Sequence, residues 1–179
     1  MLNQSLRKLT GLTFAALLAV AQLGFAGPAA SGVDFSLRAI DGNGVSSASL
    51  RGDVVVLAFG ASWLPLSREQ VQGVQKLADE YAGRKVRVFW VSTDSEAPKS
   101  RNYATDDQLR AFARKHALKV TVLRDPDGTV FKQMGVDGNQ LPAIVIIDRQ
   151  GNIAGEPLGG LDPEGNLVQQ LAGRLNALL

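Results

Sequence analysis

The chain has 179 residues, of which 45% are apolar, and this is enough for one compact domain with a sizeable core. Its net charge of +2 comes from Arg7 and Lys8; without them the 19 Lys and Arg fall to 17 and equal the 17 Asp and Glu. A neutral domain with few aromatic residues gives no reason to expect nucleic-acid binding.

Residues 1–26 have the pattern of an export signal. Arg7 and Lys8 precede an apolar stretch from Leu12 to Phe25, and small residues at Gly24 and Ala26 suit a signal peptidase. A cut near Ala29 or Ala30 and an uncleaved membrane anchor are the alternatives, although the stretch is short for a membrane span. In each case we expect the domain outside the cytoplasm, most simply in a bacterial periplasm, with the membrane contacted only through this segment.

The next part of the chain predicts a β-hairpin and a buried strand. A linker over residues 27–32 leads into a domain over residues 33–179. Alternation over residues 33–37, the turn at residues 41–44 and a short strand from Val45 indicate the hairpin. The unbroken apolar run from Val54 to Phe59 is typical of a strand buried on both faces.

Helical and strand patterns then alternate to the end of the chain. Apolar spacing predicts a first helix over residues 67–82, and Thr105 and Gln108 form a capping box that opens a second. Asp162, followed by Pro163, is expected to cap the last helix. The expected strands cover residues 86–92, 120–123, 141–148 and 153–155, with a loop over 93–103 and one or two helical turns over 130–134.

This order of elements predicts an α/β fold with helices on both faces of a central sheet. The strand that ends at Phe59 is followed by small residues and then by a helix. The N-terminus of that helix therefore lies at the carboxyl end of the sheet, where open α/β folds usually build their sites.

The segment from Phe59 to Glu69, FGASWLPLSRE, resembles the active-site segment of the thioredoxin superfamily in its TlpA-like and redoxin (AhpC/TSA-like) branch. That branch typically reads F-W-A-S-W-C-x-x-C-R-x-E. The resemblance covers residues 33–179 and implies a thioredoxin-like α/β/α sandwich with an N-terminal β-hairpin extension. It also implies thiol–disulfide oxidoreductase or peroxiredoxin-like antioxidant activity.

The thiols of this motif are absent. Leu64 stands at the position of the attacking cysteine and Ser67 at that of the resolving cysteine, and the chain has no cysteine at all. Because disulfide exchange requires a thiolate, we expect no such catalysis. Ser67 as another nucleophile would need a nearby base, and the one histidine, His116, is expected at the end of the second helix. Helix-terminal roles are favoured for both residues.

The resemblance also places Pro142 at the family's cis-proline, which lines a groove for an extended peptide. We therefore predict a polypeptide-binding or partner-binding surface without catalytic residues. Its candidate residues are Trp63, Leu64, Pro65, Leu66, Ser67, Leu141 and Pro142.

Two further hypotheses remain open, namely an oxidoreductase as the family implies and a structural subunit of an envelope complex. The sequence predicts no metal site, since it has one histidine, no cysteine and no spaced histidine–carboxylate group. We also expect no cofactor, because the chain has no glycine-rich phosphate loop of the right form.

Overall fold

The computed structural model describes residues 32–160 and 166–179. The expected signal segment, most of the linker, Asp162 and Pro163 lie outside these residues. No helix within the two ranges has the length and apolar character needed to cross a membrane.

A seven-stranded sheet forms the centre of the molecule, in the order β2-β1-β5-β4-β3-β6-β7. β3 pairs in parallel with β4, and β4 with β5, whereas the remaining neighbours are antiparallel. The strands are β1 (Ser36–Ala39), β2 (Gly44–Ser46), β3 (Val54–Gly60), β4 (Val86–Ser92), β5 (Val122–Arg124), β6 (Ala143–Ile147) and β7 (Leu158–Gly159).

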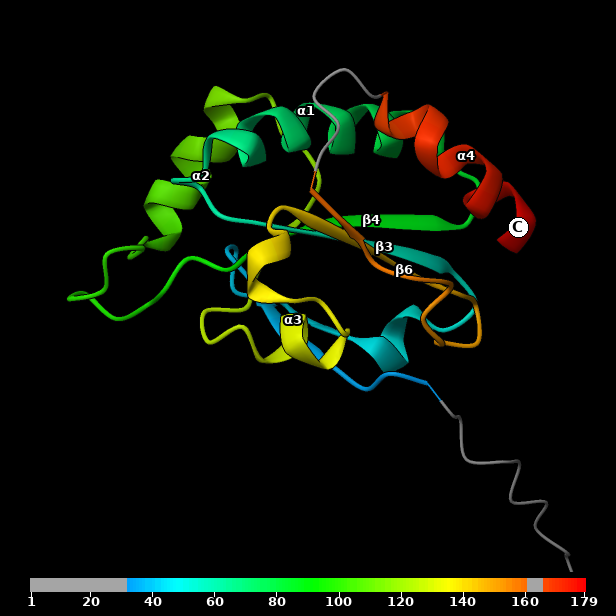
Figure 1. Ribbon diagram of the computed structural model, residues 1–179, viewed down its shortest axis with the longest axis horizontal. Helices are drawn as coiled ribbons and strands as arrows, with labels where there is room; N and C mark the ends of the chain where they lie inside the picture. Colours follow the sequence, from blue (N-terminus) through cyan, green and yellow to red (C-terminus); the bar gives the residue numbers. More distant parts are fainter. Residues whose placement is uncertain (1–31, 161–165) are drawn as a thin grey trace, which may run out of the picture.

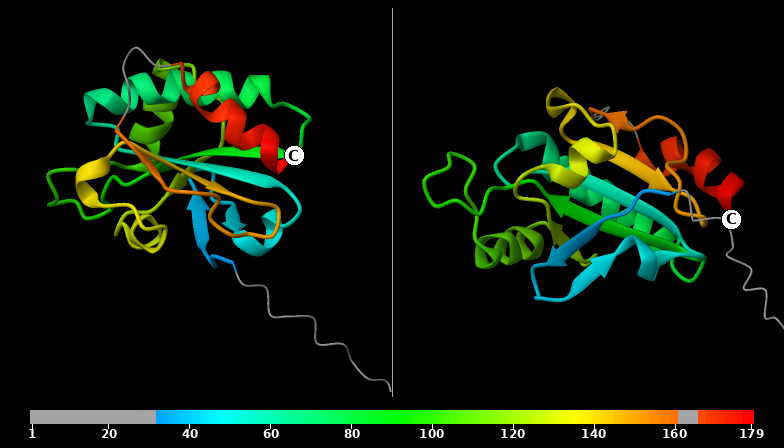
Figure 2. Two further views of the ribbon diagram at one scale, coloured as in Figure 1. Left: turned by 45° about the vertical axis from the view of Figure 1, so that its right-hand side comes forward. Right: turned by 90° about the horizontal axis from the view of Figure 1, so that it is seen from below.

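Helices cover both faces of this sheet, as the sequence predicts (Figure 1). Three longer helices lie on one face: α1 (Pro65–Glu80), α2 (Asp106–Lys115) and α4 (Leu167–Leu178). The short α3 (Thr129–Gln133) lies on the other face, and the two side views of Figure 2 show the same layers. The 3₁₀ turns are η1 (Ser47–Leu50) and η2 (Gly138–Gln140).

The alternating side chains of β3 build two cores. Val54, Val56 and Ala58 face α1, α2 and α4, whereas Val55, Leu57 and Phe59 pack on the opposite side with Phe131 of α3. All seven residues of β3 are buried, which explains the continuous apolar run in the sequence. The strand that leads into the candidate site is therefore fixed on both faces.

Several element bounds differ from the prediction. α1 begins at Pro65 rather than Ser67, because proline has a backbone angle suited to the first helical position. The predicted strand at residues 153–155 is wrong: Ile153 makes a single bridge to Ile147, and the last strand is β7. The described cap of α4 is Asn166, whose side chain accepts from the Val168 amide at 3.0 Å. β1 and β5 each begin later than predicted.

Candidate functional site

The loop between β3 and α1 lies next to the start of β6, at the end of the sheet where β3 finishes. The antiparallel register pairs Phe59 with Ala143, so the chain after Phe59 leaves the sheet beside the Leu141–Pro142 segment that enters it. The peptide bond between Leu141 and Pro142 is cis. The two segments that sequence analysis selected thus come together. A hydrogen bond from the Gln70 side chain to the Ala143 carbonyl links them across 73 residues of sequence.

The predicted surface residues differ strongly in exposure. Trp63 is 54% exposed, Pro65 is exposed, and Leu64, Leu66 and Leu141 are half-buried. We call these five residues the Trp63 surface. Ser67 and Pro142 are buried, so they support this surface from below rather than contact a partner from it.

Ser67 has a structural environment. It lies in the first turn of α1, and its hydroxyl accepts a hydrogen bond from the Ala61 amide at 3.0 Å. His116 is the C-cap of α2, where its ring packs on Phe112 with 4.7 Å between centroids. Burial, followed by the charges of Lys115 and Arg68, lowers the pKa of His116. Within the described residues no hydrogen bond joins His116 to Ser67, so this part of the chain holds no serine–histidine pair.

Gln70 ties the two segments together beneath the Trp63 surface. Its Nε2 donates to the carbonyl oxygens of Phe59 and Ala143, each at 3.2 Å, and its Oε1 accepts from Trp90 Nε1 at 3.1 Å. Sequence analysis missed this residue. The sequence could have indicated it by its spacing, because Gln70 is four residues before Val74 and seven before Leu77 and so lies on the buried face of α1.

A second buried polar residue, Asp94, holds the loop that carries Trp63. Its carboxylate accepts from the amide of Ser62 at 2.8 Å, from the Ser62 hydroxyl at 2.9 Å and from Ser92 Oγ at 2.7 Å. Asp94 is 1% exposed, so these hydrogen bonds replace its contacts with water. Sequence analysis had assigned it only to a loop. Trp63 is therefore presented from a loop that is anchored at its preceding residue.

Leu64 is the N-cap residue of α1 and its side chain makes no capping hydrogen bond. Ser, Thr, Asp and Asn are the usual residues at this position because their side chains accept from the first helical amides. A thiolate here would be stabilised by the helix N-terminus, whereas the side chain of Leu64 has no ionisable group. The site therefore offers an apolar, partly exposed surface in place of a nucleophile.

The described residues contain no group of three or more His, Cys, Asp or Glu side chains arranged to hold a metal ion. No side chain of the Trp63 surface is charged, so the surface offers apolar side chains and backbone groups.

The fold and this site define a thioredoxin-like protein without the reactive thiols. The family model for the AhpC/TSA family matches residues 28–155. The chain belongs to the AhpC/TSA family, as the redoxin resemblance of its sequence implies.

Known relatives agree with this assignment. The thioredoxin-like protein YneN of Bacillus subtilis is 30% identical over 122 residues, covering 67% of this chain and 65% of YneN. The match therefore spans slightly less than two thirds of YneN. Among solved structures, MTB DsbF superposes with a TM-score of 0.63 at 26% identity, covering 81% of this chain and 95% of that protein.

A secreted disulfide oxidoreductase of Mycobacterium tuberculosis, homologous to E. coli DsbE, has a TM-score of 0.62 at 23% identity. It covers 80% of this chain and 96% of that protein. These likenesses confirm the predicted thioredoxin-like α/β/α sandwich.

Proposed function

We propose that this protein binds an extended polypeptide segment non-covalently at the Trp63 surface. The observation that carries the proposal is the 54% exposure of Trp63 on a loop anchored through Ser62 to Asp94. Within the described residues only Trp63 and Tyr103 are large hydrophobic side chains with high exposure. Tryptophan is among the residues that most often dominate binding energy at protein interfaces.

The backbone beside Trp63 offers the groups that an extended peptide needs. Neither the N–H nor the C=O of Leu141 takes part in a hydrogen bond within the described residues, whereas the carbonyls of Gln140 and Pro142 both accept from the Gly160 amide. An extended segment that pairs with a backbone gains affinity from main-chain hydrogen bonds and specificity from side-chain contacts. The backbone of Leu141 would supply the main-chain hydrogen bonds, and Trp63 would supply the side-chain contacts.

The binding would involve no covalent step. Disulfide exchange and thiol peroxidase chemistry both require a thiolate, and these 179 residues contain no cysteine. Ser67, at the position of the resolving thiol, is buried and bonded to the Ala61 amide. The surface therefore acts by contact alone.

A titration with a reduced and carboxymethylated unfolded protein tests this proposal. Calorimetry should show saturable binding that Trp63→Ala weakens by at least tenfold, the loss typical of an interface hot spot. Tyr103→Ala is the matched control, because it removes the other exposed aromatic side chain, and it should leave the Kd within about twofold. Absence of saturable binding, or equal losses in the two variants, would contradict the proposal. Stable co-purification with an envelope assembly in that case would favour a structural subunit.

We also propose that the domain acts outside the cytoplasm after removal of residues 1–26. The basic residues, the apolar stretch and the small residues at Gly24 and Ala26 support this proposal. Mass spectrometry of the protein from its native cells should then find Gly27 at the N-terminus. A membrane-bound chain that retains residues 1–26 would show an anchor instead.

A further inference from the structure

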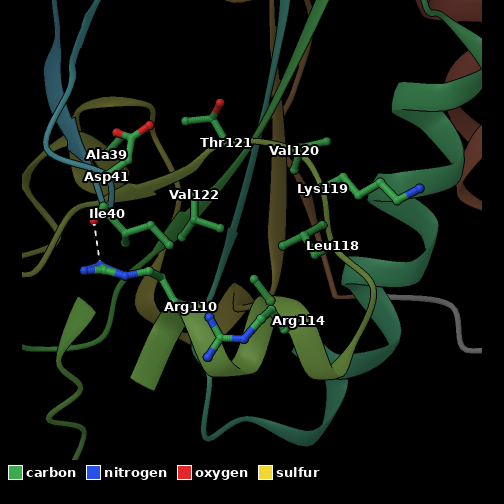
Figure 3. Close-up of a pocket in the computed structure, with 11 residues that line it drawn as sticks. Ala39, Ile40, Asp41, Arg110, Arg114, Leu118, Lys119, Val120, Thr121 and Val122 are labelled. Atoms are coloured by element: carbon green, nitrogen blue, oxygen red, sulfur yellow. Dashed lines mark hydrogen bonds between the residues drawn. The ribbon is translucent and has the colours of Figure 1, made fainter. Parts of the chain in front are cut away.

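A second recess lies between α2, the end of β1 and the segment that precedes β5. It has a volume of about 340 Å³ and contains no residue of the Trp63 surface (Figure 3). This volume is within the range of small-molecule sites, which is roughly 300–1,000 Å³. We call it the α2 pocket.

The floor of the α2 pocket is apolar. It is formed by Ile40 after β1, by Leu118 and Val120 before β5, and by Val122 of β5. Leu118 and Val122 are buried, whereas Ile40 and Val120 are partly exposed and pack on the core beneath the helices. An apolar body bound here would cover the exposed parts of these side chains and remove them from water.

Two arginines of α2 border this floor. Arg110 and Arg114 are four residues apart and therefore lie on one side of the helix. Arg110 is already engaged, since its Nη1 donates to the Ile40 carbonyl at 3.0 Å and its Nη2 lies 3.5 Å from Asp107. The Arg114 guanidinium makes no hydrogen bond or ion pair within residues 32–160 and 166–179. An unengaged guanidinium at the margin of an apolar floor suits a carboxylate, which it can bind with two parallel hydrogen bonds.

One acidic and one further basic side chain also line the α2 pocket. Asp41 is the one acidic side chain, and its Oδ1 accepts from the Asn43 amide at 3.0 Å within the hairpin turn. Figure 3 shows its carboxylate on the side of Ile40 away from Arg114. The side chain of Lys119 extends in the opposite direction, toward α1. Arg110 and Arg114 are therefore the basic side chains beside the floor, whereas Asp41 and Lys119 lie to either side of it.

We propose that the α2 pocket binds a small amphipathic carboxylate, with its apolar body on the Ile40–Val122 floor and its carboxylate on Arg114. The proposal is independent of the polypeptide-binding function, because the two sites share no residue. It predicts discrimination by charge, since a cationic analogue with the same apolar body would meet the two arginines of α2.

Octanoate is a suitable probe, with octylammonium as the analogue of opposite charge. Calorimetry on the folded protein should show octanoate binding at one site, and its affinity should fall with rising salt because exposed charge pairs are screened. Methyl NMR should place the largest shifts at Ile40, Val120 and Val122. Arg114→Gln should weaken octanoate about five- to tenfold, as expected for the loss of a charge-assisted hydrogen bond.

Lys76→Gln is the matched control, because Lys76 is a basic residue that lines a different groove, between α1 and the end of α2. It should leave the octanoate affinity unchanged. Equal weakening by the two substitutions would overturn the proposal, as would equal affinity for octylammonium. Absence of saturable binding, or methyl shifts centred on Leu64 and Leu141, would also overturn it.

Discussion

The hydroxyl of Ser67 is used inside the protein, where it accepts from the Ala61 amide and has no exposed surface. Leu64, three residues earlier, is half-buried at the N-cap of α1. The two positions that hold thiols in the redoxin motif therefore differ in solvent exposure. This difference can be measured with introduced cysteines, because the chain has none of its own.

Thiols introduced one at a time should react at very different rates. We expect Leu64→Cys to react readily with a disulfide reagent and to have a thiol pKa below the ordinary value of about 8.5, since the helix N-terminus stabilises a thiolate. Ser67→Cys should react only after unfolding. Reaction rates measured across pH for both variants check this expectation, and equal rates would show that our assignment of exposure at the site is wrong.

Gly60 is required by the close approach of three buried side chains. A Cβ placed there would lie 2.8 Å from Gln70 Oε1, 2.9 Å from Ser67 Oγ and 2.9 Å from Trp90 Nε1. These atoms belong to the network that ties α1 to β3 and β6. The redoxin motif has tryptophan at this position, so Gly60 is a residue at which this chain departs from the motif.

Gly60→Ala should lower the free energy of unfolding by about 1–3 kcal/mol, the usual cost of overpacking a filled core. Gly44→Ala is the matched control, since Gly44 is also in a strand and a Cβ there would meet nothing within 4 Å. It should be neutral or slightly stabilising, because alanine reduces the freedom of the unfolded chain. Urea unfolding of both variants measures the difference, and similar stabilities would refute the packing argument.

At the scale of elements, the start of α2 is attached to the sheet by charge. Asp106 lies 2.7 Å from Arg38 of β1 and 3.0 Å from the buried Arg124 of β5. Hydrogen bonds from Arg38 and then from Arg124 lower the pKa of Asp106 against the opposing effect of burial. The Arg124 Nη2 also donates to the Asp94 carbonyl at 3.1 Å, which links this cluster to the residue that anchors the Trp63 loop.

This arrangement predicts a pH dependence of stability. Because the pKa of Asp106 is lower in the folded state, its stabilising contribution is present above about pH 4, the unfolded value, and is lost as the pH falls through the folded value. Asp106→Asn should therefore lower stability at pH 7 and make the remaining decline below pH 4 less steep.

Asp107→Asn is the control, since Asp107 is 92% exposed and its partner Arg110 lies 3.5 Å away. It should change little at either pH. Urea unfolding at a series of pH values tests both variants, and parallel curves for wild type and Asp106→Asn would contradict the assigned role of the Asp106 carboxylate.

Local signals in the sequence predict the elements well where one physical cause dominates. The capping box of α2 is present, with Thr105 accepting from the Gln108 amide at 3.2 Å and Gln108 accepting from the Thr105 amide at 2.8 Å. The continuous apolar run of β3 is likewise as predicted. The segment after β6 is harder to predict. Ile153 and Ala154 have the residue types of a strand but make only a single bridge and one backbone hydrogen bond to β6.

At the scale of the whole molecule, the sequence predicts the α/β layers and the meeting of the Trp63 and Pro142 segments through the redoxin resemblance. It does not predict which residues hold those segments in place. Gln70, Asp94 and Trp90 act through tertiary hydrogen bonds, and no local pattern specifies the partners of such a bond. The burial of Ser67 is also set by tertiary packing, and for this reason its place in the predicted surface could not be judged from the sequence.

This protein keeps the redoxin frame while both thiols of the motif are absent. The most direct test compares disulfide reduction, such as that of insulin, by the wild-type domain and by a Leu64→Cys/Ser67→Cys double variant. We predict that the wild-type protein is inert, because it has no thiolate, and that the double variant is active, because both residues occupy the motif positions at the start of α1. Disulfide reduction by the wild-type protein, or an inert but folded double variant, would contradict this account.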